Sequence, residues 1–233
     1  MKKKQNKQYI VYSLLSLFSL NIEASEEGQG CSIASRLKEQ TPSFRIREEP
    51  KKREENSTKK VALKITETLT SVETIHQNQK LIIKRTSSNK QHTCPPFCIQ
   101  PINIQGVTTV GELEVLDFIK QLKGKEGRLL IDIRNSKVYK KNTIPGAINI
   151  PYTMLEDTSK YQNRVLQLLG GEKIDKLWKF KYVPILLIFG ESEESSYPLQ
   201  AIKTLIKLAY PNNKIYFYRA GVKGWSRLGL TLY

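Results

Sequence analysis

Residues 183–208 place a buried strand directly before an amphipathic helix, and this pairing constrains the fold more than any other segment. Residues 183–189 are apolar throughout, as expected for a strand whose sheet is covered by helices on both faces, and Pro184 fits near its start. Residues 196–208 repeat apolar side chains at helical spacing. In an α/β protein the loop between such a strand and helix, here residues 190–196, is where ligands and reactive groups usually lie.

The rest of the C-terminal half alternates strands and helices in the same way. Apolar spacing predicts helices at 110–122 and 163–171, and strands at 128–134, 147–150 and 214–218. Strands that alternate with helices favour a three-layer α/β fold with a mainly parallel sheet. At 233 residues the chain has room for one such domain with extensions.

The N-terminus is typical of a secretory signal peptide. Four lysines within residues 1–7 precede an apolar run at residues 9–20, and the segment closes at Ala24. A membrane anchor is the alternative, but a helix that spans a bilayer needs about 20 apolar residues and this run is shorter. We therefore expect a signal peptide at residues 1–24, a periplasmic or secreted protein, and no stable membrane anchor after cleavage.

Three further segments precede the predicted domain. Residues 25–60 are polar and charged, so they cannot bury enough surface to become ordered and we expect a disordered linker. Residues 61–93 contain two short strand patterns around a polar turn, which predicts at most a small β appendage. Residues 94–105 begin with Cys-Pro-Pro-Phe-Cys, and the globular pattern follows from residue 106.

The net charge of +16 raises the question of a polyanionic partner. The basic excess divides evenly between the residues before 94 and the rest, without a concentrated basic arm or a basic motif interleaved with aromatic residues. We expect a lysine-rich solvated surface and no nucleic-acid partner. Polyanion binding with a steep salt dependence stays an alternative.

Two ordered motifs resemble the rhodanese-like domain family. The first is LLIDIRNSKVYKKNTIPGAINIPY, residues 129–152, in which Thr143 stands where the family commonly has a histidine. The second is KIYFYRAGVKGWSRLGL, residues 214–230, a strand followed by a glycine-containing turn, a tryptophan and a closing glycine. The resemblance covers residues 106–233 and implies a single five-stranded, mainly parallel sheet with helices on both faces.

The resemblance also implies a mechanism from which this chain departs. In the family a cysteine at the end of the fourth strand takes sulfane sulfur as a persulfide and passes it to a thiophilic acceptor; backbone N–H groups before a helix stabilise its thiolate. Alignment of LLIFG, residues 186–190, with that strand puts Gly190 in the cysteine's place. The rest of the loop has neither thiol nor arginine, and its carboxylates would repel thiosulfate or phosphate. Its residues are Glu191, Ser192, Glu193, Glu194, Ser195 and Ser196.

The loop serines have a structural explanation. A serine nucleophile needs a positioned base, and the histidines of the chain, His76 and His92, fall outside residues 106–233. We expect Ser195 or Ser196 to cap the helix, with the glutamates against its positive end. The protein's own carboxylates would then occupy the part of the loop where an anionic sulfur donor would bind.

Three charged residues border the pocket according to the resemblance. Asp132 and Arg134 match family positions there, and Arg219 falls in the turn after the last strand. We expect Asp132 and Arg134 to hold loops by a charged hydrogen bond rather than to contact a ligand, although a ligand role stays open.

The three cysteines allow several kinds of chemistry. Cys94 and Cys98 enclose a proline-stiffened loop, and in an oxidising compartment a disulfide between them is the leading interpretation. A redox-active pair is an alternative, although the spacing is Cys-x3-Cys. A metal site with His92 would have only three ligands, so we expect no metal or other cofactor. Cys31 is either free or paired with another chain. The segment around Cys94 also resembles a branch of secreted bacterial rhodanese-like proteins.

Two functions of different classes follow from these residues. The first is an exported rhodanese-like protein without sulfurtransferase activity, which serves as a binding or accessory module for a protein or small molecule. The alternative is a thiol-active sulfur-transfer or redox protein that uses Cys94 and Cys98.

Overall fold

The chain divides into two units, residues 1–61 and 62–233. The computed structural model describes residues within the second unit, in three stretches: 63–87, 101–122 and 127–233. The predicted signal peptide, the linker, His92 and all three cysteines lie outside the described residues.

The described residues contain a five-stranded sheet in which every neighbouring pair is parallel. Its strands, in spatial order, are β3 (Thr108–Val110), β9 (Ile215–Tyr218), β8 (Ile185–Phe189), β4 (Arg128–Asp132) and β5 (Ile148–Asn149). The predicted α/β fold with a five-stranded parallel sheet is confirmed. Strand β3 was not located from sequence because it is a three-residue edge strand without an apolar run.

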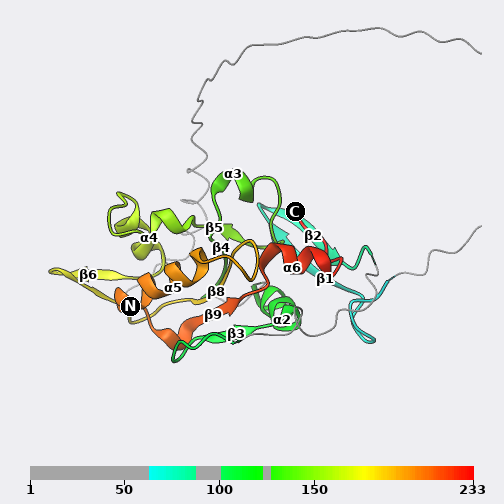
Figure 1. Cartoon of the computed structure of the whole chain (residues 1–233), viewed down its shortest axis with the longest axis horizontal. Coiled ribbons are helices and arrows are strands. Elements are labelled where there is room, and N and C mark those ends of the chain that lie inside the picture. The colour runs from blue at the N-terminus through cyan, green and yellow to red at the C-terminus, as the bar shows by residue number, and fades with distance from the viewer. Residues whose placement is uncertain (1–62, 88–100, 123–126) are drawn as a thin grey trace, which may run out of the picture. The chain divides into compact units, whose positions relative to one another are not determined.

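Helices cover both faces of the sheet (Figure 1). On one face lie α2 (Glu112–Leu122) and α6 (Gly221–Arg227), and on the other α4 (Gln162–Leu168) and α5 (Tyr197–Lys207). Strand β8 shows the resulting two-sided burial, since Leu187 and Phe189 pack with the first pair of helices and Leu186 and Ile188 with the second. Among the described residues, no helix combines the length and apolarity needed to cross a membrane.

Short elements fill the connections. They are α3 (Ser136–Tyr139), η2 (Tyr152–Met154), η3 (Asn212–Lys214) and a small hairpin of β6 (Glu172–Ile174) and β7 (Leu177–Lys179). Helix α4 ends before Gly170, whose φ of 88° lies in the left-handed region typical of a helix C-terminus.

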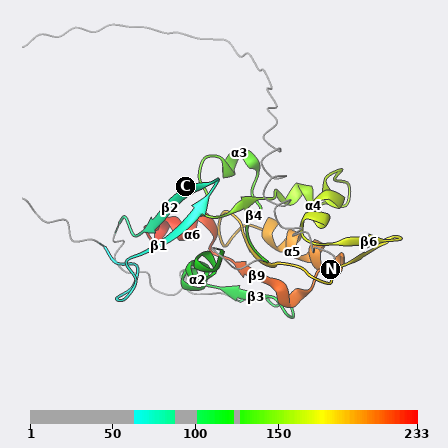
Figure 2. The same cartoon turned by 180° about the vertical axis from the view of Figure 1, so that it is seen from behind.

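A second hairpin precedes the sheet in sequence, as the strand patterns predicted. Strands β1 (Ser71–His76) and β2 (Gln79–Lys84) pair antiparallel around Gln77 and Asn78, whose positive φ values of 45° and 64° suit a two-residue hairpin turn. Val72 and Ile83 are buried in the same core cluster as residues of α2 and α6. The hairpin lies beside these two helices (Figure 2). The expected appendage is thus packed into the α/β core.

His76, the last residue of β1, joins this hairpin to the α/β domain. Its Nδ1 accepts a hydrogen bond from the Gly146 backbone N–H at 3.1 Å, and its Nε2 lies 3.4 Å from the Tyr139 hydroxyl. The Tyr233 ring packs 4.0 Å away between ring centroids. Burial lowers the pKa of His76 from 6.5 to about 4, which keeps the imidazole neutral and able to accept. His76 lies outside residues 106–233 in sequence, but in space it belongs to the domain.

The buried imidazole predicts a loss of stability at acidic pH. Because the folded pKa of His76 lies below the unfolded value, stability should fall as the pH drops from 6.5 to about 4. The loss due to His76 is at most about 3 kcal/mol. We expect His76→Asn to remove most of this dependence, because its side-chain oxygen can accept from Gly146 without titrating. Urea unfolding of wild type and variant near neutral pH and near pH 4 measures this change in the free energy of unfolding. An equal loss in wild type and variant would show that another group titrates.

Candidate functional site

Two strand ends meet at the predicted site. Strands β4 and β8 are neighbours, and their last residues, Asp132 and Phe189, are paired in register. Arg134 lies two residues beyond β4, and residues 190–196 connect β8 to α5. The parallel sheet therefore brings Asp132, Arg134 and this loop to the edge where α/β domains usually bind ligands.

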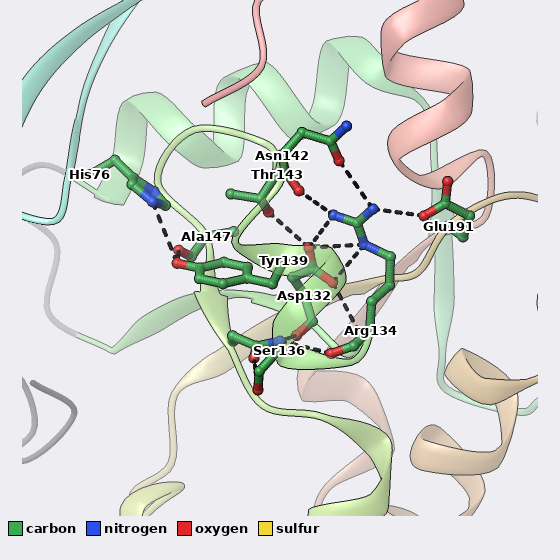
Figure 3. A network of polar contacts seen from close by, with 10 residues as sticks. His76, Asp132, Arg134, Ser136, Tyr139, Asn142, Thr143, Ala147 and Glu191 are labelled. Atoms are coloured by element: carbon green, nitrogen blue, oxygen red, sulfur yellow. Dashed lines mark hydrogen bonds and ion pairs between the residues drawn. The ribbon is translucent and has the colours of Figure 1, made fainter. Parts of the chain in front are cut away.

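Asp132 and Arg134 form a buried ion pair with several hydrogen bonds (Figure 3). Arg134 donates from Nη2 to Asp132 Oδ2 at 2.8 Å and from Nε to both carboxylate oxygens at 3.1 Å. The Arg134 backbone N–H donates to Oδ1 at 2.9 Å, and the Thr143 hydroxyl donates to Oδ2 at 2.8 Å. Thr143 thus supplies a donor to a fully buried carboxylate.

The remaining donors of Arg134 bind two further segments. Nη2 donates to the Asn142 backbone oxygen at 2.6 Å, while Nη1 donates to Asn142 Oδ1 at 3.3 Å and to Glu191 Oε2 at 2.7 Å. A guanidinium has five N–H donors, so this set occupies all of them. Burial opposes the charged form, but Asp132 and Glu191 outweigh it and raise the pKa of Arg134. Arg134 therefore holds loops, as its position in the sequence suggested.

Gly190 directly follows β8 and is buried under the start of α5. A Cβ placed on Gly190 would lie 2.7 Å from Pro198 Cγ and 3.3 Å from Pro198 Cδ. Contacts below about 3 Å are far shorter than the 3.5–4.0 Å optimum for two carbon atoms. The proline ring therefore occupies the space that a side chain at position 190 would need.

The start of α6 closes over the same loop. The Val222 backbone N–H donates to the Gly190 oxygen at 3.1 Å, and the Lys223 N–H donates to the Glu191 oxygen at 2.8 Å. Gly221 permits this approach, since it has a φ of 61° and its Cβ would lie 2.6 Å from the Gly190 oxygen. The first N–H groups of α6 thus bind loop carbonyls.

The loop glutamates bind cationic side chains. Glu191 pairs with Arg134, and Glu193 accepts from Arg227 Nη1 at 3.1 Å. A hydrogen bond from its own backbone N–H, with Arg227 and Lys223, outweighs burial and lowers the pKa of Glu193. These two glutamates were expected against the positive end of α5, and the structure shows their carboxylates in ion pairs with arginines.

The loop serines also differ from expectation. Ser196 occupies the position before α5 but has helical backbone angles and makes no side-chain cap. The Ser195 hydroxyl accepts from the Ser192 N–H at 3.2 Å, so it stabilises the loop turn instead. His76 binds Gly146 and not the loop. No base contact to a loop serine is seen among the described residues.

Residues 115–228 match the family model of the rhodanese-like domain. They form a rhodanese-like domain. A protein from Lactobacillus plantarum is similar in structure, with 19% identity, coverage of 53% of this chain and 86% of that chain, and a TM-score of 0.37.

Two named sulfurtransferases are also similar to this rhodanese-like domain. A single-domain sulfurtransferase from Saccharomyces cerevisiae has 19% identity, covers 53% of this chain and 89% of that chain, and gives a TM-score of 0.35. A thiosulfate sulfurtransferase from Pseudomonas aeruginosa has 21% identity, covers 55% of this chain and 20% of that chain, and gives a TM-score of 0.34. No curated protein matches the chain.

Sequence reasoning placed some site residues of the rhodanese-like domain and missed others. Arg219 lies half-buried in the turn between β9 and α6, as expected. Asn142 and Pro198 were missed, because Pro198 looks in sequence like an ordinary helix-start residue and Asn142 like part of a variable loop. Cys94 and Cys98 lie outside the described residues, within which no group of possible metal ligands is found.

Loss of the Asp132 carboxylate should cost far more stability than neutralisation of Glu191. Asp132→Ala leaves a buried guanidinium without its main counter-charge, which costs about 3–5 kcal/mol. The Glu191 side chain is 38% exposed, so Glu191→Gln should cost about 1 kcal/mol or less. Urea unfolding compares the two variants. Equal costs would show that Asp132 is not the dominant partner of Arg134.

A double-mutant cycle tests whether Pro198 fills the space beside Gly190. Gly190→Ala should cost about 1–3 kcal/mol through overpacking. In a Pro198→Ala background the added methyl group has room, so the same change should cost at least about 1 kcal/mol less. Gly190 is not among the residues with positive φ, so backbone strain does not enter. Additive free energies of unfolding would contradict the contact.

Proposed function

We propose that this protein is an exported rhodanese-like protein that has lost sulfurtransferase activity and acts as a binding or accessory module. The observation that carries this function is the packing at position 190. Gly190 has no side chain to hold sulfur, and the ring of Pro198 takes up the space beside it.

Sulfur transfer needs chemistry that this loop does not supply. A thiolate must attack the outer sulfur of thiosulfate, which forms a persulfide and releases sulfite; cyanide then removes that sulfur as thiocyanate and regenerates the thiolate. A glycine cannot take either step. The donor is also an anion, and the loop offers it Glu191, Glu193 and Glu194 while Arg134 is already occupied.

A binding role is supported by what the loop exposes. Tyr197, the first residue of α5, is 48% exposed, and its ring stacks on Tyr152 at 4.1 Å between centroids with an interplanar angle of 17°. Glu194 is exposed three residues earlier. The exposed ring of Tyr197 and the carboxylate of Glu194 together favour a cationic group on the partner.

Thiosulfate:cyanide transfer by the purified full chain tests the loss of activity. We expect no thiocyanate above the protein-free rate, with an active thiosulfate sulfurtransferase as the positive control. Turnover that survives alkylation of all three cysteines would contradict the proposal. Turnover that disappears in Cys94→Ser would instead support the thiol-active alternative, in which Cys94 and Cys98 carry the chemistry.

A further inference from the structure

A groove on the β1–β2 hairpin lies apart from the loop at residues 190–196. Its volume is about 330 Å³, within the range of small-molecule sites. Its lining residues are Leu63, Thr70, Ser71, Ile82, Lys84 and Arg85.

The lining combines apolar surface with positive charge. Leu63 and Ile82 are 38% and 43% exposed, although exposed aliphatic side chains lose the free energy that burial would provide. Lys84 and Arg85 supply two cations, and no lining residue is acidic. Ile82 and Lys84 alternate along β2 and therefore share one face of the hairpin.

Arg85 has an unmet hydrogen-bonding group. Its Nε is buried and has no hydrogen-bond partner in the structure. A buried donor without an acceptor is unfavourable, and a turn of the guanidinium toward the groove would let an anionic oxygen accept from it. The charge and the missing acceptor therefore point to the same kind of ligand.

Both sides of the groove are held by backbone hydrogen bonds. Thr231 donates its N–H to the Lys84 oxygen at 3.0 Å, and Arg85 bridges to Leu230. On the other side, the Ile65 N–H donates to the Leu69 oxygen at 2.8 Å and closes the turn after Leu63. A site whose walls are already ordered loses less conformational entropy when a ligand binds.

We propose that this groove binds an aliphatic carboxylate. The alkyl chain lies against Leu63 and Ile82, and the carboxylate contacts Lys84 and Arg85. This ligand site goes beyond the proposed function, because none of its residues belongs to the loop at residues 190–196.

Calorimetric titration of the full chain with octanoate tests the pairing of chain and charge. The controls are 1-octanol, which has the chain without the charge, and acetate, which has the charge without the chain. We expect octanoate to bind at least about tenfold more tightly than either, since a charged hydrogen bond contributes about 1.5–3 kcal/mol. Equal affinity for octanoate and 1-octanol, or no binding of octanoate, would overturn the proposal.

A pair of variants locates the site. Arg85→Gln should weaken octanoate at least about tenfold and leave 1-octanol unchanged. Lys80→Gln is the matched control, because Lys80 lies on the same strand but outside the groove, where it pairs with Glu73 at 3.0 Å. If the two substitutions weakened octanoate binding equally, the positive charge of the hairpin would attract octanoate in general, and Arg85 would not contact it in the groove.

Methyl NMR of the wild-type chain keeps the test independent of variant folding. Octanoate should shift the methyl signals of Leu63 and Ile82 and leave those of Ile75, which is exposed on the same hairpin outside the groove. Shifts at Ile75 as large as those at Ile82 would contradict the assignment.

Discussion

The buried ion pair between Asp132 and Arg134 organises the whole carboxyl edge of the sheet. One guanidinium ties the end of β4 to the segment at Asn142 and, through Glu191, to the loop after β8. Two buried charges are costly to desolvate, and they are tolerated only when every donor and acceptor is used. That condition is met here, so the network works as an anchor and leaves no donor of Arg134 for an added anion.

Glu191 connects this ion pair to the loop at residues 190–196, because its carboxylate accepts a hydrogen bond from Arg134. The domain keeps the strand, loop and helix, while Glu191 and Glu193 pair with arginines and the proline ring of Pro198 fills the space at Gly190. Function depends on the site and not on the architecture, so the rhodanese-like fold alone does not imply sulfur transfer. The proposed loss of sulfur transfer therefore does not require a less stable domain.

The fold was predictable where local pattern decides it. The apolar run at residues 183–189 identified the central strand β8, because a strand buried on both faces leaves that signature. The docking of His76 on Gly146 was not predictable, since the two residues are 70 positions apart and only tertiary packing joins them. The capping role given to Ser196 was wrong because the loop before α5 is already helical at that residue. Local sequence patterns predicted the strands and helices, whereas contacts between residues far apart in sequence determine the geometry of the site.

The most direct test of the account is a crystal structure of the protein soaked with excess thiosulfate. We expect that structure to show Glu191 on Arg134, the Pro198 ring beside Gly190, and no ordered anion in the loop. Thiosulfate bound to Arg134 in place of the Glu191 carboxylate would contradict this expectation. It would show that an anionic donor can displace Glu191 and bind in the loop.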